Sequence, residues 1–574
     1  MMSPLDALLQ RIETHLTVIY GEGDHRSLVE ELVDAMRLRE HFFEPVPFAN
    51  HWSEKDVALI TYGNTIQREG HKPFEELIQF LDRRLQDALS IVHVLPYFPW
   101  TSDDGFAVSD YLEVKPELGD WSHLETLAGK YRVMSDLVVN HCSASHEWFE
   151  QYQRGEKPGC DYFFEASPED DLSEVVRPRT SPLLRPTETP SGTKHVWCTF
   201  GHDQIDLNFS EPKLLLELVK IIRAHLDHGV SVFRLDAVAF IWKEVGSRSI
   251  NLLETHELVR LFRTLIEHVK PDAVIITETN IPNHENLAYF GNCNEAHSIY
   301  NFSLPPLLLH ALTTGNSFHL KQWMMRMPPA QPGTTYFNFI ASHDGIGLRP
   351  AEGLLSDEEI DDLVALMKKR GGLVSERALS EGESRPYEIN ISLFDALGGE
   401  AQFLCAHTVL LALEGIPAFY IHSLLGTRND YERYGRTKHN RHINRHQWDA
   451  DELDQFLDDP KSHHATILRK MRRLIEVRKS QPAFHPNATQ FTLHLGDQIF
   501  AFWRQSMDRR NNVFCLHNVS DEEQRIPVSS INLIATEDWI DLLSDRSLNA
   551  EADEIILEPY QSVWLANRRK HLPY

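Results

Sequence analysis

The feature that most constrains the fold of this chain is the alternation of eight short apolar runs with stretches of helical periodicity. The clearest intervening helix is expected at 212–228, with Ser210 as its N-cap and Gly229 closing it. Strands that alternate with helices form parallel sheets, and eight of them predict a closed (β/α)8 TIM barrel. The predicted strands are 57–62, 91–97, 131–139, 230–238, 274–279, 299–304, 336–342 and 416–421.

Four of these runs end in carboxylate or histidine side chains, in the segments 136–141, 233–236, 275–278 and 339–344. A parallel barrel presents the C-terminal ends of its strands at one face, where its loops build the catalytic site. Two carboxyl groups that face each other across a sugar ring are the machinery of glycosidic bond cleavage. The sequence therefore predicts an enzyme that acts on a glycosidic bond.

The segments outside the apolar runs predict further structural units. Residues 1–55 precede the first strand and are expected to form a helical extension. Long insertions follow the third and the seventh strand, and insertions at these strand ends form the rim of a barrel's active site. Alternating runs after residue 484 predict an antiparallel β domain. The expected division is barrel at 56–142, 210–344 and 400–484, domain B at 143–209, domain B′ at 345–399, and the β domain at 485–574.

Composition excludes several other classes of protein. The formal net charge of −28 disfavours nucleic acid and anionic membranes as partners, because both repel an acidic surface. No apolar run is long enough to span a bilayer, and the first twenty residues lack the uninterrupted apolar stretch of a signal peptide. The six cysteines lie far apart without paired metal spacing, so neither a disulfide framework nor a zinc site is expected. A cytoplasmic enzyme is the simplest interpretation.

Three carboxylates are candidates for the chemistry. Asp236 is the expected nucleophile, because Arg234 points to the same side of its strand and keeps it ionised. Glu278 follows an apolar run, where a carboxyl group has the raised pKa that a general acid requires. Asp344 is expected to stabilise positive charge on the sugar in the transition state.

Each candidate also has a structural alternative. A single carboxylate at a strand end is usually a helix cap or a solvated loop residue, and a lone histidine is more often a packing residue than a ligand. Asp136 is expected to be structural. His141 and His343 are candidates to donate hydrogen bonds to sugar hydroxyls. Four polar strand ends in barrel order favour one shared catalytic site over these separate alternatives.

The four polar strand ends resemble the four signature regions of the α-amylase superfamily, and the segment 204–208 resembles the additional signature that follows this family's inserted domain B. The resemblance extends from about residue 56 onward. It is strongest to the sucrose-phosphorylase-like branch, through the segments 234–246, 304–312, 343–347, 428–430 and 443–446. Polymer-cleaving amylases carry Lys-His after the nucleophile, where this chain has Ala239 and Phe240. That difference favours a small glucoside.

The resemblance implies a retaining α-glucoside phosphorylase that passes through a β-glucosyl intermediate on Asp236 and releases α-glucose 1-phosphate. The family's phosphate contacts correspond to Arg177 or Arg179 in the first insertion and to Tyr387 in the second, although the two arginines could also lie in a solvated loop. Asp104 offers an alternative alignment to Asp103. By the family's pattern, the glucosyl unit is bound by Asp103, Phe106, His141, Arg234, His343 and Arg445.

The sequence leaves three alternatives for the acceptor, which is the alcohol released when the glucoside is cleaved. Sucrose phosphorylases typically carry Gln where this chain has Glu388, which disfavours fructose as the leaving group. Glu388 is suited to bind a small polyol and to repel a glycerate carboxylate, whereas Arg385 would do the reverse. We therefore expect 2-O-α-glucosylglycerol first, glucosylglycerate second and sucrose third.

Two other classes of function have to be weighed. A hydrolase or transglucosidase would share every catalytic carboxylate and would differ in what reaches the intermediate, whereas a non-catalytic barrel scaffold would be expected to lack one of the three. Inorganic phosphate is expected as a co-substrate and no cofactor is implied. The superfamily often binds calcium near the residue that corresponds to Asn140, but the phosphorylase branch generally does without it, so no metal is expected. The chain is expected to be a monomer or homodimer that binds a small glucoside and phosphate.

Overall fold

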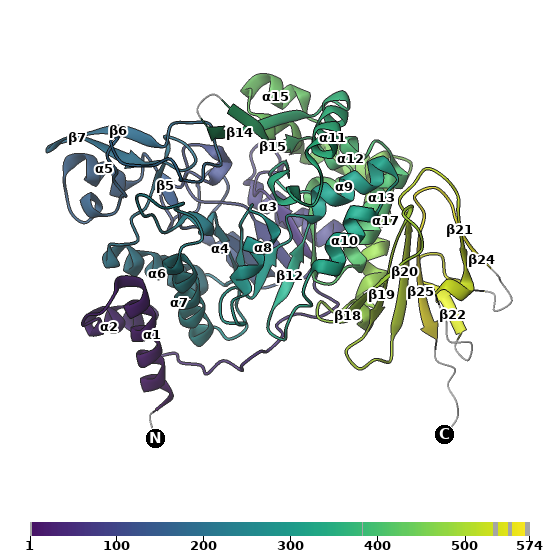
Figure 1. The fold of residues 1–574 in the computed structure, drawn as a ribbon, viewed down its shortest axis with the longest axis horizontal. Coiled ribbons are helices and arrows are strands. Elements are labelled where there is room, and N and C mark those ends of the chain that lie inside the picture. Colours follow the sequence, from purple (N-terminus) through teal and green to yellow (C-terminus); the bar gives the residue numbers. More distant parts are fainter. Residues whose placement is uncertain (1–2, 381–382, 532–537, 549–553, 569–574) are drawn as a thin grey trace.

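Eight parallel strands close into a barrel at the centre of the computed structural model, which describes residues 3–380, 383–531, 538–548 and 554–568 (Figure 1). Every barrel strand lies within or overlaps a predicted run, so the predicted TIM barrel is confirmed. Around the barrel the strands follow the order β1-β16-β12-β11-β10-β9-β4-β3. Their bounds are β1 (Ala58–Thr61), β3 (Ile91–Val94), β4 (Arg132–Val138), β9 (Val230–Asp236), β10 (Val274–Thr277), β11 (Ser298–Tyr300), β12 (Thr335–Asn338) and β16 (Ile416–Tyr420).

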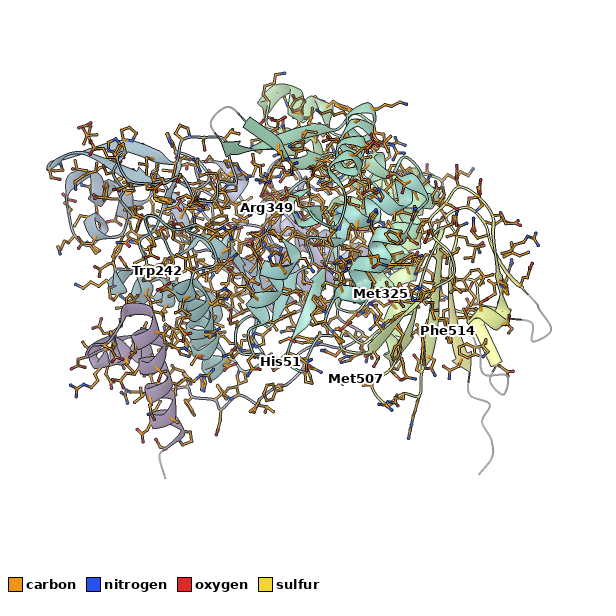
Figure 2. The ribbon with its side chains drawn as sticks, in the orientation of Figure 1. His51, Trp242, Met325, Arg349, Met507 and Phe514 are labelled. Atoms are coloured by element: carbon orange, nitrogen blue, oxygen red, sulfur yellow. The ribbon has the colours of Figure 1, made fainter. Side chains whose placement is uncertain are left out.

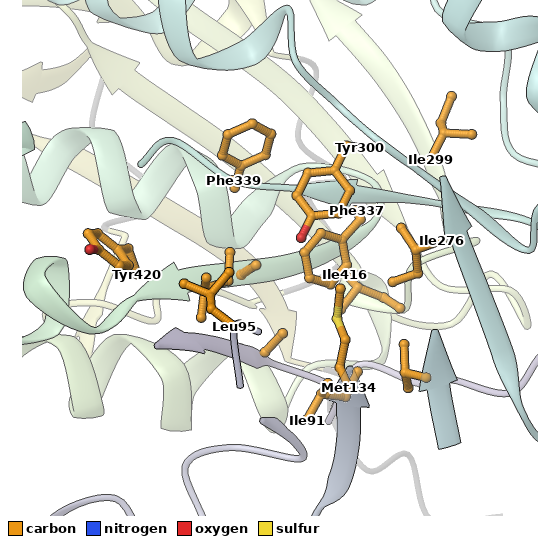
Figure 3. Close-up of a cluster of buried hydrophobic side chains, with 14 of the residues drawn as sticks. Ile91, Leu95, Met134, Ile276, Ile299, Tyr300, Phe337, Phe339, Ile416 and Tyr420 are labelled. Carbon is orange, nitrogen blue, oxygen red and sulfur yellow. The ribbon is translucent and has the colours of Figure 1, made fainter. Parts of the chain in front are cut away.

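Large apolar side chains fill the interior of the barrel (Figure 3). Met134 of β4, Ile276 of β10 and Phe337 of β12 are all buried, and Tyr300 packs its ring 4.8 Å from that of Phe337. The centre is therefore a packed core rather than a pore, as in other barrels of eight strands. A solid interior leaves the strand ends as the place where ligands can bind.

Helices surround the barrel, and one differs from the prediction at its start. The helix α6 (Pro212–Asp227) begins one residue after Glu211, whose carboxylate accepts the N–H of Lys213 and so caps the helix. The Ser210 hydroxyl instead donates to Asn208 at 2.6 Å, so the expected Ser210 cap is wrong. Gly229 follows the helix with a positive φ of 88°, as expected for a residue that closes a helix. Other helices of this layer are α3 (Pro73–Arg84), α4 (Trp121–Ala128), α7 (Leu253–Val269), α9 (Leu304–Thr314), α13 (Glu400–Ala412) and α17 (His463–Lys479).

The N-terminal extension is helical and packs on the outside of the barrel. The helices α1 (Pro4–Tyr20) and α2 (Arg26–Ala35) contact α7 and α6, respectively. His15 of α1 is buried and bonds Glu257 of α7 at 2.5 Å through Nδ1 and Thr264 at 3.1 Å through Nε2. The extension is thus joined to the barrel by buried polar contacts as well as by its apolar stripe.

Two groups of elements interrupt the barrel at the C-terminal ends of its strands (Figure 1). The first contains β5 (His141–Ser143), α5 (Glu147–Arg154), β6 (Leu184–Thr189), β7 (Gly192–Trp197) and β8 (Gln204–Asp206), with β5 paired to β8 and β6 to β7. The second contains β13 (Ile346–Gly347), α11 (Asp357–Lys369), β14 (Leu373–Ser380) and β15 (Glu383–Asn390), which build a sheet of order β13-β15-β14. Apart from β5, which begins at His141 within the predicted barrel segment, these elements lie in the segments predicted as insertions.

An antiparallel sheet follows the barrel, as the sequence predicted. Its order is β18-β19-β20-β25-β22-β23, and Phe514, labelled in Figure 2, lies on its central strand β20. Residues 569–574 of the expected β domain and residues 1–2 of the expected extension lie outside the described residues. The strands are β18 (Thr489–Leu493), β19 (Ile499–Gln505), β20 (Asn512–Asn518), β22 (Asp538–Asp541), β23 (Arg546–Ser547) and β25 (Ser562–Arg568).

Within the described part of the chain, we find no helix with the length and apolar character needed to cross a membrane.

Candidate active site

The strand β9 ends in a paired arginine and aspartate. Arg234 and Asp236 are two residues apart, so both side chains point to the same side of the strand. Arg234 Nη1 donates to Asp236 Oδ1 at 2.8 Å and also to Asp136 on the neighbouring strand β4. Asp136 is fully buried and contacts His93 Nε2 at 2.7 Å on its other side. Asp136 thus holds the arginine that orients Asp236, which agrees with its expected structural role.

Glu278 follows β10 and faces the turn after β9. Its Oε2 accepts the backbone N–H of Ala237 at 3.1 Å, and its Oε1 lies 3.9 Å from Arg234 Nη2. Ala237 has a φ of +50°, a left-handed conformation that few side-chain-bearing residues adopt. The left-handed turn aims the N–H of Ala237 at Glu278 and therefore fixes the second carboxyl group beside the first.

The two carboxyl groups compete for ionisation. Burial raises the pKa of both Asp236 and Glu278, and neighbouring carboxylates raise each further, while the guanidinium of Arg234 acts in the opposite direction. Arg234 lies 2.8 Å from Asp236 but 3.9 Å from Glu278. Because two buried like charges cannot both be ionised easily, one carboxyl group of the pair keeps its proton, and the direct contact from Arg234 at 2.8 Å favours the charge on Asp236. These are the states required of a nucleophile and a general acid.

Asp344 follows β12 and has arginine partners of its own. Although burial raises the pKa of Asp344, the guanidinium groups of Arg441 and Arg445 lower it overall. Arg441 Nη1 lies 2.8 Å from Asp344 Oδ1, and Arg445 Nη2 lies 3.8 Å from the same oxygen. A third, ionised carboxylate therefore lies at the mouth of the barrel, where it can stabilise positive charge on a sugar.

One cavity at the C-terminal ends of the strands brings most of the predicted residues together. It is closed on two sides by residues of the two insertions, including Phe200 and Tyr387. Phe200, Gln204, Asn280 and Arg441 also line it, although no sequence pattern indicated them as site residues. The predicted residues that line the cavity are Asp103, Phe106, His141, Arg179, Arg234, Asp236, Glu278, His343, Asp344, Tyr387 and Glu388.

The histidines and Phe106 give the cavity a surface suited to a sugar. The ring of Phe106 stacks on His343, with centroids 5.2 Å apart and planes 11° apart. His141 Nε2 lies 3.0 Å from the carbonyl oxygen of Phe106 and 3.2 Å from Gln204 Nε2. Burial lowers the pKa of both histidines, so each is neutral and has one donor and one acceptor nitrogen.

Arg445 lies behind the cavity wall rather than on it. Its Nη1 bonds Asp104 at 2.7 Å, and its Nε donates to the carbonyl oxygen of His343 at 2.8 Å. Its buried Nη2 has no hydrogen-bond partner among the described residues. Asp104 rather than Asp103 is thus the partner of Arg445, and it is Asp103 that lines the cavity. The two adjacent aspartates have separate roles in the structure.

The structure separates the two arginines of the first insertion. Arg177 donates to the carbonyl oxygen of Ser181 within its own loop and does not line the cavity. Arg179 lines it, and its guanidinium carbon lies 5.2 Å from the ring centre of Tyr387 and 5.7 Å from that of Phe200. Asn280 Nδ2 donates a hydrogen bond to the hydroxyl oxygen of Tyr387 at 3.0 Å.

Arg385 does not reach the cavity, contrary to the expectation for an acceptor-binding residue. Its Nη2 pairs with Asp357 Oδ2 at 2.6 Å, and its side chain is 42% exposed. Glu388, three residues further along β15, points the other way and is buried. Both of its oxygens bond Arg441, from Nε at 3.0 Å and from Nη2 at 2.9 Å.

Asn140 contacts an internal cation. Lys243 Nζ donates to Asn140 Oδ1 at 2.8 Å and lies 3.1 Å from Asp206 Oδ2, while Asn140 Nδ2 donates to the same carboxylate at 3.2 Å. All three side chains are buried. In the described part of the chain, no group of three or more histidine, cysteine, aspartate or glutamate side chains is arranged to hold a metal ion.

A parallel barrel whose strand ends carry this set of carboxylates, arginines and histidines has the arrangement of a glycoside-processing enzyme. The α-amylase catalytic-domain family matches residues 88–346. The glucosylglycerate phosphorylase of Allomeiothermus silvanus is 40% identical over 578 residues, which is 98% of this chain and 100% of that protein. The glucosylglycerate phosphorylase of Escherichia coli is 39% identical, over 97% of this chain and 100% of that protein.

Among solved structures, the sucrose 6F-phosphate phosphorylase from Thermoanaerobacter thermosaccharolyticum aligns with a TM-score of 0.72 and 24% identity, and the alignment covers 81% of this chain and 94% of that one. This structural likeness supports the fold alone, because the identity is low. The family assignment therefore depends on the full-length relatives, and the shared fold agrees with it. The chain belongs to the α-amylase superfamily, in the branch of the sucrose-phosphorylase-like glycoside phosphorylases.

Proposed function

We propose that this enzyme cleaves 2-O-α-glucosylglycerate with inorganic phosphate, giving α-glucose 1-phosphate and glycerate. The proposal is supported by relatives of that printed activity that cover nearly the whole chain. It is also supported by a cavity that combines a retaining set of carboxylates with a cation on the side formed by the insertions.

The proposed reaction has two steps. Asp236 attacks the anomeric carbon while Glu278 gives its proton to the departing glycerate oxygen, and a β-glucosyl ester on Asp236 forms. Glu278, now ionised, then accepts a proton from phosphate as the phosphate oxygen displaces Asp236. Asp344 stabilises the positive charge of both transition states. Two inversions leave the glucose 1-phosphate in the α configuration.

The choice of an anionic acceptor depends on the position of Arg179 in the cavity and on its lack of an ion-pair partner. No carboxylate of a described residue lies within ion-pair distance of its guanidinium, although it lines a cavity that contains five acidic side chains. The departing acceptor and the incoming phosphate occupy the same place in turn. A single unpaired guanidinium can therefore bind the glycerate carboxylate in the first step and phosphate in the second.

The expected preference for 2-O-α-glucosylglycerol is not confirmed. It rested on repulsion between Glu388 and a glycerate carboxylate, and Glu388 is neutralised by its two hydrogen bonds to Arg441. Without that repulsion, the unpaired Arg179 makes glycerate the better acceptor. Glucosylglycerol and sucrose stay as alternative substrates for the same catalytic residues.

The test is an acceptor screen in the synthetic direction. The enzyme is supplied with α-glucose 1-phosphate and with D-glycerate, glycerol, fructose or no acceptor, and phosphate release is measured. We expect glycerate to give at least about tenfold the specificity constant of glycerol, which corresponds to about 1.4 kcal/mol. A preference for glycerol or fructose would overturn the proposed substrate. Equal release without any acceptor would indicate a hydrolase.

A further inference from the structure

Arg441 joins two parts of the site that come from distant segments of the chain. It lies in the short turn Asn440–Asn444, after the last barrel strand. From there it contacts Asp344, at the end of β12, at 2.8 Å. It also forms a two-point contact with Glu388 on β15 of the second insertion, at 3.0 and 2.9 Å. One guanidinium thus connects the carboxylate at the barrel mouth with the insertion that covers the acceptor side.

The geometry of these contacts leaves little freedom. The side chain of Arg441 is 12% exposed and that of Glu388 is 2% exposed. Two N–H groups of Arg441 donate to Glu388, while its Nη1 lies 2.8 Å from Asp344 Oδ1 and 3.7 Å from Asp103 Oδ1 as an ion-pair partner. Parallel hydrogen bonds from a guanidinium to a carboxylate fix both groups in position as well as in charge.

Because Glu388 is buried at the cavity, its charge matters for any anion that enters. Alone, it would repel both phosphate and the carboxylate of a glycerate acceptor. The one positive charge of Arg441 offsets one of the two negative charges that Glu388 and Asp344 bring to the cavity, so Glu388 adds no uncompensated charge while Arg441 is present. Although burial raises the pKa of Glu388, Arg441 lowers it overall, so the pair is ionic.

We propose that Arg441 is a positioning and specificity residue: it holds Asp344 in place for catalysis, and it cancels the charge of Glu388 so that the acceptor side of the cavity admits anions. The inference rests on the proposed phosphorolysis with an anionic acceptor. It assigns to one arginine two effects that can be measured separately, because only the second depends on the charge of the acceptor.

The first test is Arg441→Gln, assayed in the synthetic direction with glycerate and with glycerol. Losing the contact to Asp344 lowers kcat for both acceptors. Of the two acceptors, exposing the charge of Glu388 raises KM only for glycerate; it also raises KM for the donor glucose 1-phosphate, which is shared by both assays and kept saturating, and KM for phosphate in the opposite direction. At about 6 Å and an effective dielectric constant of about 20, one uncompensated charge changes anion affinity about 100-fold. The ratio of specificity constants for glycerate over glycerol should fall by about that factor.

The second test is the double variant Arg441→Gln/Glu388→Gln. It removes the uncompensated charge and leaves Asp344 without its arginine partner. The glycerate-to-glycerol ratio should return to within about threefold of the starting enzyme, while the common loss in kcat remains. The single variant Glu388→Gln keeps the contact of Arg441 to Asp344 and should bind phosphate at least as tightly as the starting enzyme.

Arg377→Gln is the matched control. Arg377 lies on β14 of the same insertion and pairs with Glu352 at 2.7 Å, outside the cavity. The same substitution there should leave the ratio unchanged. Circular dichroism of each variant checks that it is folded. If Arg441→Gln alone does not fold, the double variant still tests the proposed effect on the glycerate-to-glycerol ratio.

The outcomes separate this inference from the proposed function. If the starting enzyme does not use glycerate, the proposed substrate is wrong, and the charge effect is still measured as KM for phosphate with the acceptor that it does use. If the starting enzyme uses glycerate and Arg441→Gln lowers the rates with glycerate and glycerol equally, Arg441 has no role in anion admission. A double variant that is no better than the single one would contradict the inference in the same way.

Discussion

Replacing Arg179 with glutamine should weaken phosphate binding far more than the same change at Arg177. The two residues are separated by one proline in a single loop, so they form a matched pair. Arg179 lines the cavity between the rings of Tyr387 and Phe200, whereas Arg177 is bound to a backbone carbonyl of its own loop. Of the two, only Arg179 is placed to meet an anion beside Asp236, Glu278 and Asp344.

The expected size of the effect follows from the geometry. Two unit charges about 4 Å apart attract by about 4 kcal/mol at an effective dielectric constant of about 20. Arg179 is only half-buried, so screening by solvent reduces its contribution to about 2 kcal/mol. We therefore expect Arg179→Gln to raise KM for phosphate about 30-fold. The two aromatic rings hold the guanidinium in place, and Arg179→Lys should recover only part of the loss, because lysine lacks the planar fork.

The assay measures glucose 1-phosphate formation while phosphate is varied at saturating glucoside, and the reverse reaction while glycerate is varied. Arg179→Gln should raise KM for both anions, and at saturating glucose 1-phosphate it should leave KM for glycerol within about threefold. Arg177→Gln should change neither KM by more than about twofold. Equal impairment of the two variants, or a rise in KM for glycerol as large as that for phosphate, would contradict the proposed role of Arg179.

Three further predictions concern other parts of the molecule. Because the pKa of Glu278 is raised, its acid form persists to higher pH, so kcat/KM for the glucoside should fall only above that raised pKa, which a pH–rate profile checks. Glu278→Gln should lose about 10²–10⁴-fold in kcat, and its profile should lack the alkaline decline. Removing the ammonium group with Lys243→Met leaves Asp206 buried without a cation and should cost about 3–5 kcal/mol of stability in urea unfolding, with partial recovery by Asp206→Asn in the same chain. The glucose 1-phosphate formed should be the α anomer by proton NMR, and a β product would contradict a double displacement at Asp236.

The barrel could be predicted because each strand carries its own signal. Residues 230–233 and 274–276 are short, largely apolar runs that charged side chains follow within three residues, and neither needs a distant partner to be identified. The pairing of strands then follows from the closed topology, which sets Asp136 of β4 beside Arg234 of β9. Carboxylates at strand ends converge because all parallel strands end at the same face.

The parts of the site that were missed or misplaced depend on contacts between loops. Arg441 lies in an irregular turn without periodicity, and no local pattern indicates that it reaches two carboxylates. Arg385 and Glu388 are three residues apart on one strand with a register shift nearby, so one faces solvent and the other the cavity. Ser210 has the right residue type for a helix cap, but it already bonds the preceding turn.

The charge of the cavity near the bound acceptor therefore depends on pairs of interacting residues rather than on single residues. Judged alone, Glu388 predicts a site that rejects anions. Its partner Arg441 is 53 residues away in the chain, and the two together carry no net charge. Asp344 is held by the same arginine, so a chain that exchanged residue 388 for a neutral side chain would keep its catalytic carboxylate in place and change only the field on the acceptor side. Acceptor choice can thus change through residue 388 without disturbing Asp236 or Glu278, provided that Arg441 is kept to hold Asp344.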